Sequence, residues 1–376
     1  MHVAPNPGPP VGKSHDVSFE REKTLMRIVS KQGAGTEARE GALVNIHLTI
    51  SEPAEDGSLT EIYNSHDIAP EGLRFELGRS LHSEAVERSL HHCQPGAVID
   101  CLCTCPDASD DCSLGLRAQK LPDGAKELWC SPKGPVGHAQ EAFKEPAMIR
   151  PKPEDTEPPW EPPQYVMMFH ILLDAVLTEG AVPMHMLAGE RLLWVQQRKL
   201  WATELFKRGY SRRAMHHYKK ALLDLETPIE WKEEAQLVER NQLRLTLHLS
   251  SAACALKLDT KREYPNLQTP KQHYDVHHDA IFHCTRVLAA DKSNVKALYR
   301  RASAHLMLPA DRHINGLALA LLDLDRALEE DPQNAEVRKL HKRAREMQKK
   351  ADTEAVGMYS KMIAADEADT AGAAGG

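Results

Sequence analysis

Two pairs of residues in the second half of the chain combine hydrogen-bond donors with the spacing of one helical turn, and such donors can bind an anion. Lys199 and Thr203 are four residues apart, and so are Lys296 and Arg300, so each pair lies on one face of a helix. An ammonium or guanidinium group donates charge-assisted hydrogen bonds to a carboxylate, and these are stronger than bonds between neutral groups. The alternative interpretation is that these are solvated charges on amphipathic helices.

The cysteines offer a second chemistry, metal binding, which their spacing does not favour. Cys101, Cys103 and Cys105 recur at every second residue, which places them on one face of a strand, whereas zinc sites use C-x₂₋₄-C loops. We therefore expect buried thiols, no metal and no cofactor. The alternatives are a zinc site that also uses Cys112 and Cys130, and a redox sensor. The chain has no P-loop, no G-x-G-x-x-G loop and no G-x-S-x-G elbow.

The composition predicts a soluble globular protein of two or three domains. The chain has 376 residues, of which 27% are charged and 41% hydrophobic, and its formal net charge is −7. The negative net charge argues against nucleic acid as the main ligand. The chain contains no run of about 18 apolar residues, so we expect no membrane helix. The N-terminus lacks an apolar signal region, and the cysteines fit a reducing compartment. We therefore expect a cytoplasmic protein, with the nucleus as a second location.

The first half of the chain predicts a mostly antiparallel sheet with one short helix. Short apolar segments separated by Gly, Pro and Asp are expected to form strands at 25–29, 42–50, 75–78, 97–104 and 165–176. The helix is expected at 83–91, where Ala85, Val86 and Leu90 share one face.

The second half predicts three pairs of helices of the tetratricopeptide type, followed by a capping helix. Small or apolar residues recur at helical spacing where paired helices would pack closely, at Ala214, Tyr218, Ala221, Ala252, Ala280, Cys284, Val287, Ala320, Leu324 and Ala327. A loop at 259–272 is expected inside the second pair, and Pro332 is expected to end the third. Three pairs with a cap are enough to bury a continuous core.

These patterns give a predicted domain organisation. It consists of a disordered N-terminus (1–16), a sheet domain (17–178) with a long insert (106–164), three helix pairs (184–332), a capping helix (333–363) and a disordered tail (364–376). The end of the insert, 146–163, is rich in proline and is expected to be extended and exposed.

Four segments of the first half, A-L-V-N-I-H-L-T-I, I-Y-N-S, L-R-F-E-L-G-R and Q-P-G-A-V-I-D-C-L-C, resemble an FKBP-type prolyl isomerase domain. Followed by the repeats, such a domain gives the layout of the large immunophilins. An insert that ends in V-G-H-A, the segment F-H-I-L-L and the segment P-I-E-W are similar to the aryl hydrocarbon receptor-interacting protein family. The resemblance covers about residues 20–355. It implies an α+β fold, an FKBP-like antiparallel sheet with one short helix, followed by an all-α tetratricopeptide-repeat solenoid.

The resemblance also implies an isomerase pocket, an apolar bowl of aromatic side chains around an X-Pro amide, which is degenerate in this chain. The family pattern places pocket positions on Leu48, Tyr63, Asn64, Val86 and Phe169. Val86 replaces the floor tryptophan, Leu48 a tyrosine and Ala69 the arginine that pairs with an aspartate. Only Tyr63 and Phe169 keep aromatic character. We therefore expect no catalytic residues, with residual isomerase activity as the alternative.

Finally, the resemblance implies a clamp for the C-terminal carboxylates of a heat-shock chaperone of the ninety-kilodalton class. Lys199, Lys296 and Arg300 match the three cations of the clamp, while Thr203 and Ser250 stand at its two asparagine positions. We expect a monomeric, non-catalytic co-chaperone that links the chaperone to a client protein, for which a receptor is one candidate, and that binds neither nucleic acid nor membrane. The alternatives are an active prolyl isomerase delivered to clients by the repeats, and a repeat scaffold without a chaperone ligand.

Overall fold

The computed structural model of the protein describes residues 9–19, 25–53, 58–80, 82–104, 167–260, 275–309 and 315–373, with side chains up to 357. The chain divides into two compact units, 1–240 with 258–274, and 241–257 with 275–376. The insert predicted at 106–164, its proline-rich end and nearly all of the loop predicted at 259–272 lie outside the described residues. The predicted borders of the domains stay a prediction.

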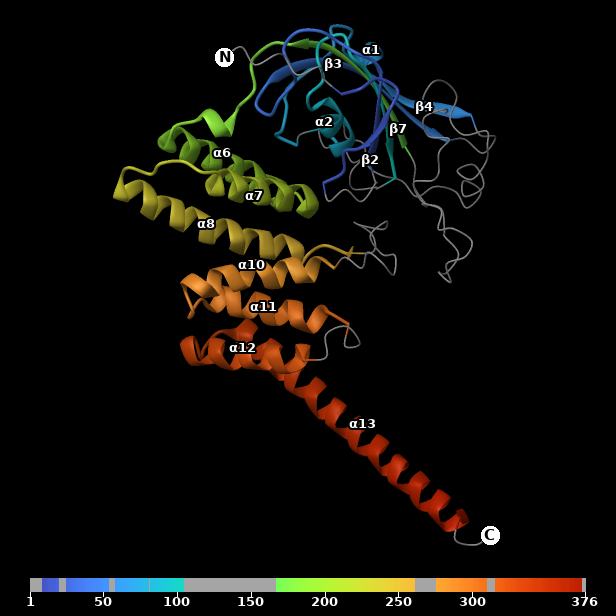
Figure 1. Ribbon diagram of the computed structural model, residues 1–376, viewed down its shortest axis with the longest axis vertical. Helices are drawn as coiled ribbons and strands as arrows, with labels where there is room; N and C mark the ends of the chain where they lie inside the picture. Colours follow the sequence, from blue (N-terminus) through green and yellow to red (C-terminus); the bar gives the residue numbers. More distant parts are fainter. Residues whose placement is uncertain are drawn as a thin grey trace. The chain divides into compact units, whose positions relative to one another are not determined.

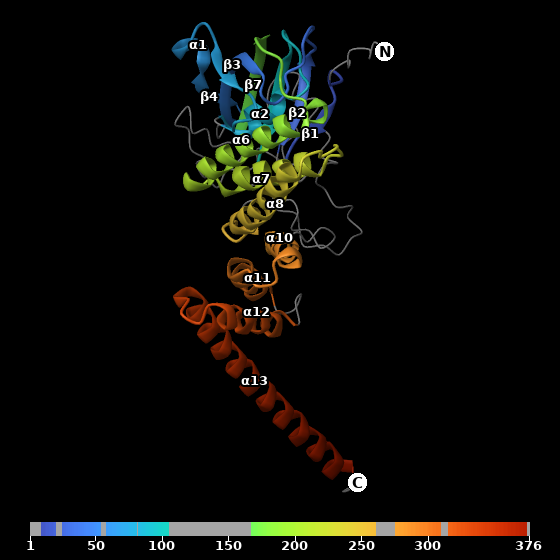
Figure 2. The same ribbon diagram turned by 90° about the vertical axis from the view of Figure 1, so that its left-hand side faces the viewer.

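The first unit contains a seven-stranded antiparallel sheet in the order β1-β2-β6-β7-β3-β4, with β5 paired to β3. Its strands are β1 (Ser14–Asp16), β2 (Leu25–Lys31), β3 (Leu43–Pro53), β4 (Leu59–Asn64), β5 (Leu73–Glu76), β6 (Val98–Cys103) and β7 (Met167–Val176). Figures 1 and 2 show the short helix α2 (Glu84–Leu90) against this sheet, where it contacts β6 and β7. The predicted antiparallel sheet and helix are confirmed.

Local sequence explains where α2 begins and which face it buries. Ser83 has an extended backbone, and its hydroxyl accepts a hydrogen bond from the backbone N–H of Val86 at 3.2 Å. This is the bond with which an N-cap residue satisfies a free donor at the start of a helix. Ala85, Val86 and Leu90 are completely buried and belong to the core under the sheet. The apolar face predicted from the sequence is therefore the face that packs.

Two stretches predicted to be disordered are in part regular. Residues 14–16 form β1, which pairs with β2 because the edge of β2 offers unpaired backbone groups. At the other end, α13 (Ala335–Ala373) continues past 363 through an alanine-rich segment, and alanine has the highest helix propensity. These two elements, at 14–16 and 364–373, lie in stretches for which the sequence predicted disorder. The strand β4 was not among the predicted strands.

The helices of both units form the predicted pairs. They are α6 (Ala188–Lys207) with α7 (Ser211–Glu226), α8 (Glu234–Ala255) with α10 (Val276–Ala290), and α11 (Val295–Met307) with α12 (Gly316–Glu330). A single-turn helix α1 (Ser65–Ile68) and a 3₁₀ turn, η2 (Pro183–His185), complete the described helices. In the second unit α13 packs against α12 and then continues as a long helix (Figures 1 and 2).

Small side chains let the helices of each pair approach. Ala214 and Ala221 of α7 are completely buried, as are Ala320 and Ala327 of α12. Between α6 and α7 the chain turns at Gly209, whose φ of +92° lies in the left-handed region that closes many helix ends. The sequence pattern thus predicted the packing positions.

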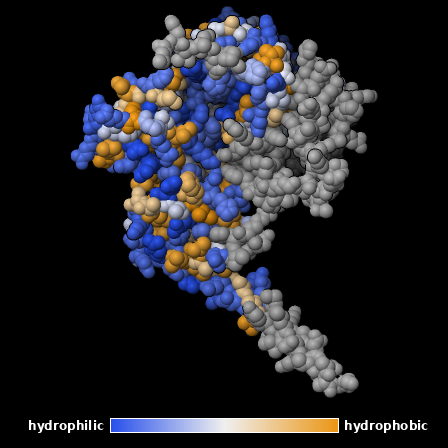
Figure 3. Space-filling model, in the orientation of Figure 1, coloured by the Kyte–Doolittle hydropathy of each residue, from blue (hydrophilic) through white to orange (hydrophobic). Residues whose placement is uncertain are grey.

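Apolar groups also remain on the surface of the helices. Figure 3 shows apolar patches scattered among hydrophilic ones on the face in view. Leu193 and Leu200 of α6 are 67% and 59% exposed, and Leu322 of α12 is 57% exposed. Scattered exposed leucines are normal on a protein surface and by themselves identify no site. No helix among the described residues is long and apolar enough to cross a membrane.

Candidate functional site

The first two predicted clamp residues lie on α6 in the first unit. Lys199 is half-buried, and the Thr203 hydroxyl donates a hydrogen bond to the Lys199 carbonyl at 2.8 Å. The same hydroxyl oxygen lies 3.0 Å from the Tyr218 hydroxyl of α7. A threonine hydroxyl has only one proton to donate. In this conformation Thr203 therefore links α6 to α7 and has no proton left for a ligand. From its residue type alone, the hydroxyl would be expected to donate a hydrogen bond to a ligand.

The other three predicted clamp residues lie in the second unit. Lys296 is exposed on α11, and Arg300 follows one turn later on the same helix. Arg300 Nη1 donates a hydrogen bond to the Leu249 carbonyl of α8 at 2.8 Å, directly before Ser250. A guanidinium carries five N–H donors, so one such bond orients it and leaves the others available. The structure thus gathers Ser250, Lys296 and Arg300 around the contact between α8 and α11.

The three predicted cations differ from their sequence neighbours in charge compensation. Among the residues that the structure describes, Lys199, Lys296 and Arg300 form no ion pair. By contrast, Arg198 pairs with Glu40, and Arg301 pairs with Asp323. The predicted positions are therefore those at which the positive charge is left without a carboxylate inside the protein. Lys199 and Thr203 belong to the first unit and the other three to the second, so their action on one ligand stays a prediction.

The predicted isomerase positions fall in the packed core of the sheet. Leu48, Val86 and Phe169 are almost completely buried, and Tyr63 is 8% exposed in the same apolar cluster. Asn64 lies outside this cluster and caps α1, where its Oδ1 accepts a hydrogen bond from the His66 N–H at 3.0 Å. The structure therefore brings four of the five positions together, as core side chains.

The described cysteines are free and buried, as the sequence predicted for Cys101 and Cys103. Burial raises the pKa of the Cys101 thiol to about 12 and that of Cys93 to about 11. Such thiols are protonated and poor ligands or nucleophiles at neutral pH. Among the described residues no three His, Cys, Asp or Glu side chains gather around a possible metal position. The remaining cysteines, Cys105, Cys112 and Cys130, lie outside the described residues.

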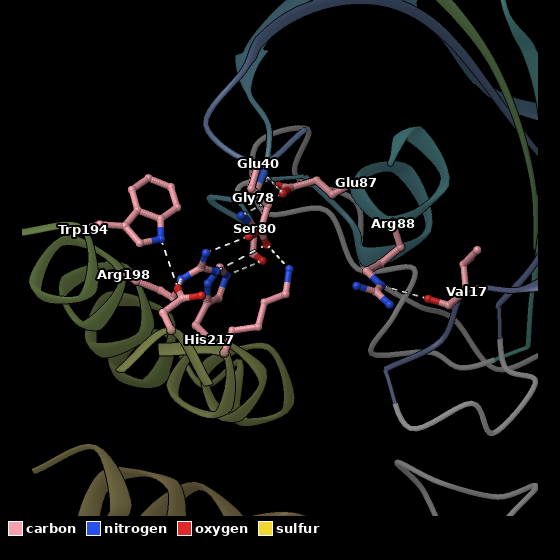
Figure 4. A network of polar contacts seen from close by, with 11 residues as sticks. Val17, Glu40, Gly78, Ser80, Glu87, Arg88, Trp194, Arg198 and His217 are labelled. Carbon is pink, nitrogen blue, oxygen red and sulfur yellow. Dashed lines mark hydrogen bonds and ion pairs between the residues drawn. The ribbon is translucent and has the colours of Figure 1, made fainter. Parts of the chain in front are cut away.

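A cluster of charged residues that the sequence did not predict joins the sheet to the first helix pair (Figure 4). Glu40 Oε2 lies 2.7 Å from Arg198 Nη2 of α6, and Glu40 Oε1 lies 2.5 Å from Lys220 Nζ of α7. Arg198 Nε also lies 3.2 Å from Asp224 Oδ2, and Trp194 Nε1 donates to that oxygen at 3.1 Å. Burial alone would raise the pKa of Glu40, but Arg198 and Lys220 hold it well below its usual range.

A second row of contacts joins the turn before α2 to α7. The Ser80 hydroxyl lies 2.7 Å from His217 Nε2, and Arg213 Nη1 donates to the His82 carbonyl at 3.3 Å. The turn itself is held by the Glu87 carboxylate, which accepts hydrogen bonds from the backbone N–H groups of Gly78, Ser80 and His82 at 2.8, 3.0 and 3.2 Å.

One signal in the sequence could have revealed this cluster. Arg198 lies three residues after Val195 and four before Ala202, both of them completely buried. It therefore occupies the apolar face of α6, and it is itself only 1% exposed. A charge at such a position must be paired, although the periodicity does not say with which residue.

Comparison with known proteins places the chain near FKBP-type immunophilins. No protein-family model matches the chain. The chain is 24% identical over 324 residues to the peptidyl-prolyl cis-trans isomerase FKBP4 of Bos taurus, which covers 86% of this chain and 54% of that protein. Its human counterpart is 33% identical over 133 residues, 35% of this chain and 24% of that protein. The chain thus spans about half, or less, of the length of these curated relatives.

The comparison with solved structures found a tetratricopeptide domain. The C-terminal TPR-containing domain of an FK506-binding protein from Plasmodium falciparum covers 46% of this chain and 99% of its own, at 24% identity and a TM-score of 0.38. The sequence likeness to an FKBP-type isomerase covers 86% of the chain and so includes both the sheet and the helix pairs that the structure shows.

Proposed function

We propose that the protein is a non-catalytic co-chaperone whose helix pairs bind the C-terminal carboxylates of a heat-shock chaperone of the ninety-kilodalton class. The observation that carries this proposal is the lack of charge compensation at Lys199, Lys296 and Arg300 within the described part of the chain. The adjacent Arg198 and Arg301 are each neutralised by a carboxylate. Cations left free at the positions that the family resemblance assigns to a clamp favour an anionic ligand from outside.

The geometry within the second unit fits a terminal carboxylate. Arg300 is oriented by its bond to the Leu249 carbonyl, and Lys296 is exposed one turn earlier on the same helix. A peptide that ends in aspartate carries two carboxylates on its last residue, its α-carboxylate and its side chain. Because the Thr203 proton is already engaged, we expect the cations to supply most of the affinity.

The core of the sheet supports the non-catalytic part of the proposal. Aliphatic Leu48 and Val86 fill positions where the family uses aromatic side chains, and Asn64 is engaged as a helix cap. An active prolyl isomerase remains the second candidate, because curated relatives with that name are up to 33% identical over 133 residues. The link to a client, with a receptor as one candidate, the monomeric state and the narrower kinship with the aryl hydrocarbon receptor-interacting protein family belong to the same proposal.

Calorimetry with the free-acid peptide Met-Glu-Glu-Val-Asp tests the proposed clamp. Micromolar binding corresponds to about −8 kcal/mol, and one charge-assisted hydrogen bond contributes roughly 1.5–3 kcal/mol. Arg300→Ala and Lys296→Ala should therefore each weaken binding about tenfold or more. Amidating the C-terminus of the peptide should weaken it as well, and so should added salt.

Lys339→Ala is the matched control, because Lys339 is an exposed lysine of α13 outside the predicted clamp. This variant should bind the peptide as the wild type does. The proposal fails if the wild type shows no binding at several hundred micromolar peptide. It also fails if Arg300→Ala binds as tightly as Lys339→Ala, because the predicted cations would then be ordinary surface charges.

A further inference from the structure

We infer that Glu40 locks the first helix pair onto the sheet and thereby positions Lys199, so that the sheet holds one part of the clamp in place. The locking follows from contacts within the first unit. The positioning of Lys199 rests in addition on the proposed function.

The lock is a balanced cluster of two carboxylates and two cations. The Glu40 carboxylate accepts hydrogen bonds from both terminal nitrogens of Arg198, at 2.7 and 3.3 Å, and from Lys220 Nζ. Asp224 provides the second carboxylate on the other side of Arg198. The Arg198 side chain is 1% exposed, and those of Glu40 and Asp224 are 14% and 13% exposed. Removing one partner from such a cluster leaves a buried charge uncompensated, which is strongly destabilising.

Glu40 is held firmly from the side of the sheet. Its carbonyl accepts a hydrogen bond from the Ala181 N–H at 2.6 Å, and the next residue, Gly41, donates to the Leu77 carbonyl at 2.7 Å. Its side chain lies against Gly78, where an added Cβ would come within 2.8 Å of Glu40 Cγ. Glu40 is therefore a fixed anchor, and the helices, which contribute Arg198, Lys220 and Asp224, are the part that it holds.

A second point of attachment prevents rotation about the first. The turn from Gly78 to His82 is organised by Glu87 and contacts His217 and Arg213 of α7. Figure 4 shows Arg198 and His217 reaching from the helices towards Glu40 and Ser80. Two separate contacts define the orientation of a helix pair, whereas one contact leaves it free to pivot.

The lock lies next to the clamp residue in sequence. Lys199 directly follows Arg198, and Thr203 ties α6 to the Tyr218 hydroxyl of α7. Any movement of α6 that releases Arg198 must therefore also redirect Lys199. Simple electrostatics predicts the opposite effect of Glu40, because a negative charge near the cations repels an anionic tail. Weaker peptide binding after Glu40 is neutralised would therefore indicate positioning, whereas tighter binding would indicate a charge effect.

The experiment compares Glu40→Gln with Glu204→Gln in the full chain. Glu204 is an exposed residue of α6 that pairs with Arg208, so it controls for the loss of one negative charge on the same helix. Hydrogen exchange of α6 and α7 should become about tenfold faster or more in Glu40→Gln and stay unchanged in Glu204→Gln. Exchange in α11 and α12 should not change. Lys220→Gln is a milder second variant, since that side chain is 29% exposed, and should accelerate exchange in α6 and α7 less.

Binding of the free-acid Met-Glu-Glu-Val-Asp peptide tests the positioning. Glu40→Gln should weaken binding about threefold or more in the wild-type background and have no further effect in a Lys199→Ala background, because the two changes then act on one contact. Unchanged exchange in both Glu40→Gln and Lys220→Gln overturns the lock. Faster exchange with unchanged or tighter binding overturns the positioning. If the wild type does not bind the peptide, the proposed function and the positioning of Lys199 both fail, while the exchange data still decide the lock.

Discussion

The ion pair between Arg301 of α11 and Asp323 of α12 gives the sharpest prediction about stability. Two parallel hydrogen bonds of 2.7 Å join Arg301 Nε and Nη2 to the Asp323 carboxylate. The Asp323 side chain is 3% exposed and that of Arg301 is 19% exposed. The hydrogen bond to Asp323 raises the pKa of Arg301, so the guanidinium group is charged at neutral pH.

Asp323→Asn should destabilise the packing of α11 on α12 by about 3 kcal/mol. Breaking a buried pair by removing one partner costs about 3–5 kcal/mol, and the lower end applies because water reaches part of Arg301. Asp325→Asn is the matched control on the same helix. Asp325 is 44% exposed and contacts Arg345 and His341 at the surface, so its loss should cost about 0–1 kcal/mol.

Hydrogen exchange of the α11 and α12 amides measures this difference locally, which matters because a chain with two units need not unfold in one step. A cost of about 3 kcal/mol corresponds to exchange about a hundredfold faster in Asp323→Asn. Replacing both partners with apolar residues, Arg301→Met with Asp323→Leu, should restore most of the loss. If the α11 and α12 amides of Asp323→Asn exchange within about threefold of those of Asp325→Asn, the ion pair does not stabilise this contact.

Three further predictions concern acidification, catalysis and the start of α2. Burial lowers the pKa of His217 to about 3 and that of His248 to about 4, so both stay neutral when folded but protonate near 6.5 when unfolded. The free energy of unfolding should therefore fall as the pH drops from about 6.5 to 4, by at most about 1.4 kcal/mol per pH unit for each histidine. Denaturant midpoints that rise on acidification would contradict this, and His217→Gln should flatten the dependence. An X-Pro peptide assay should show only the uncatalysed rate, and turnover within about a hundredfold of an active FKBP-type enzyme would establish the isomerase alternative. Ser83→Ala should cost about 1 kcal/mol by removing the N-cap of α2, and an unchanged denaturant midpoint would argue against that role.

The elements that the sequence predicted well are those whose signal is local. The small residues of α7 and α12, and the apolar face of α2, repeat at helical spacing, so packing follows from periodicity. The strand β1 was missed because three residues after a proline-rich start have no period of their own. Its structure depends on the free edge of β2, which a local pattern does not contain.

The site was predicted only as far as residue type and spacing allow. The four-residue intervals correctly place Lys199 with Thr203 on α6, and Lys296 with Arg300 on α11. That Thr203 has already donated its proton depends on the backbone of its own helix and on Tyr218, which the intervals do not show. The partner of Arg198 is 158 residues away in sequence, so no local pattern identifies Glu40.

The burial of the cysteines has a practical consequence for measuring how the two units unfold. Cys93, Cys101 and Cys103 belong to the first unit, and Cys254 and Cys284 belong to the second. Burial keeps an alkylating reagent away from Cys101, Cys254 and Cys284 as long as the surrounding structure is closed. Burial also raises the pKa of these thiols to about 12, so they stay in the unreactive protonated form. Each becomes reactive only when its own unit opens. Pulsed alkylation followed by peptide mass spectrometry can therefore time the opening of each unit separately in the unmodified chain. Cys101 reports on the sheet of the first unit, and Cys284 reports on the second unit.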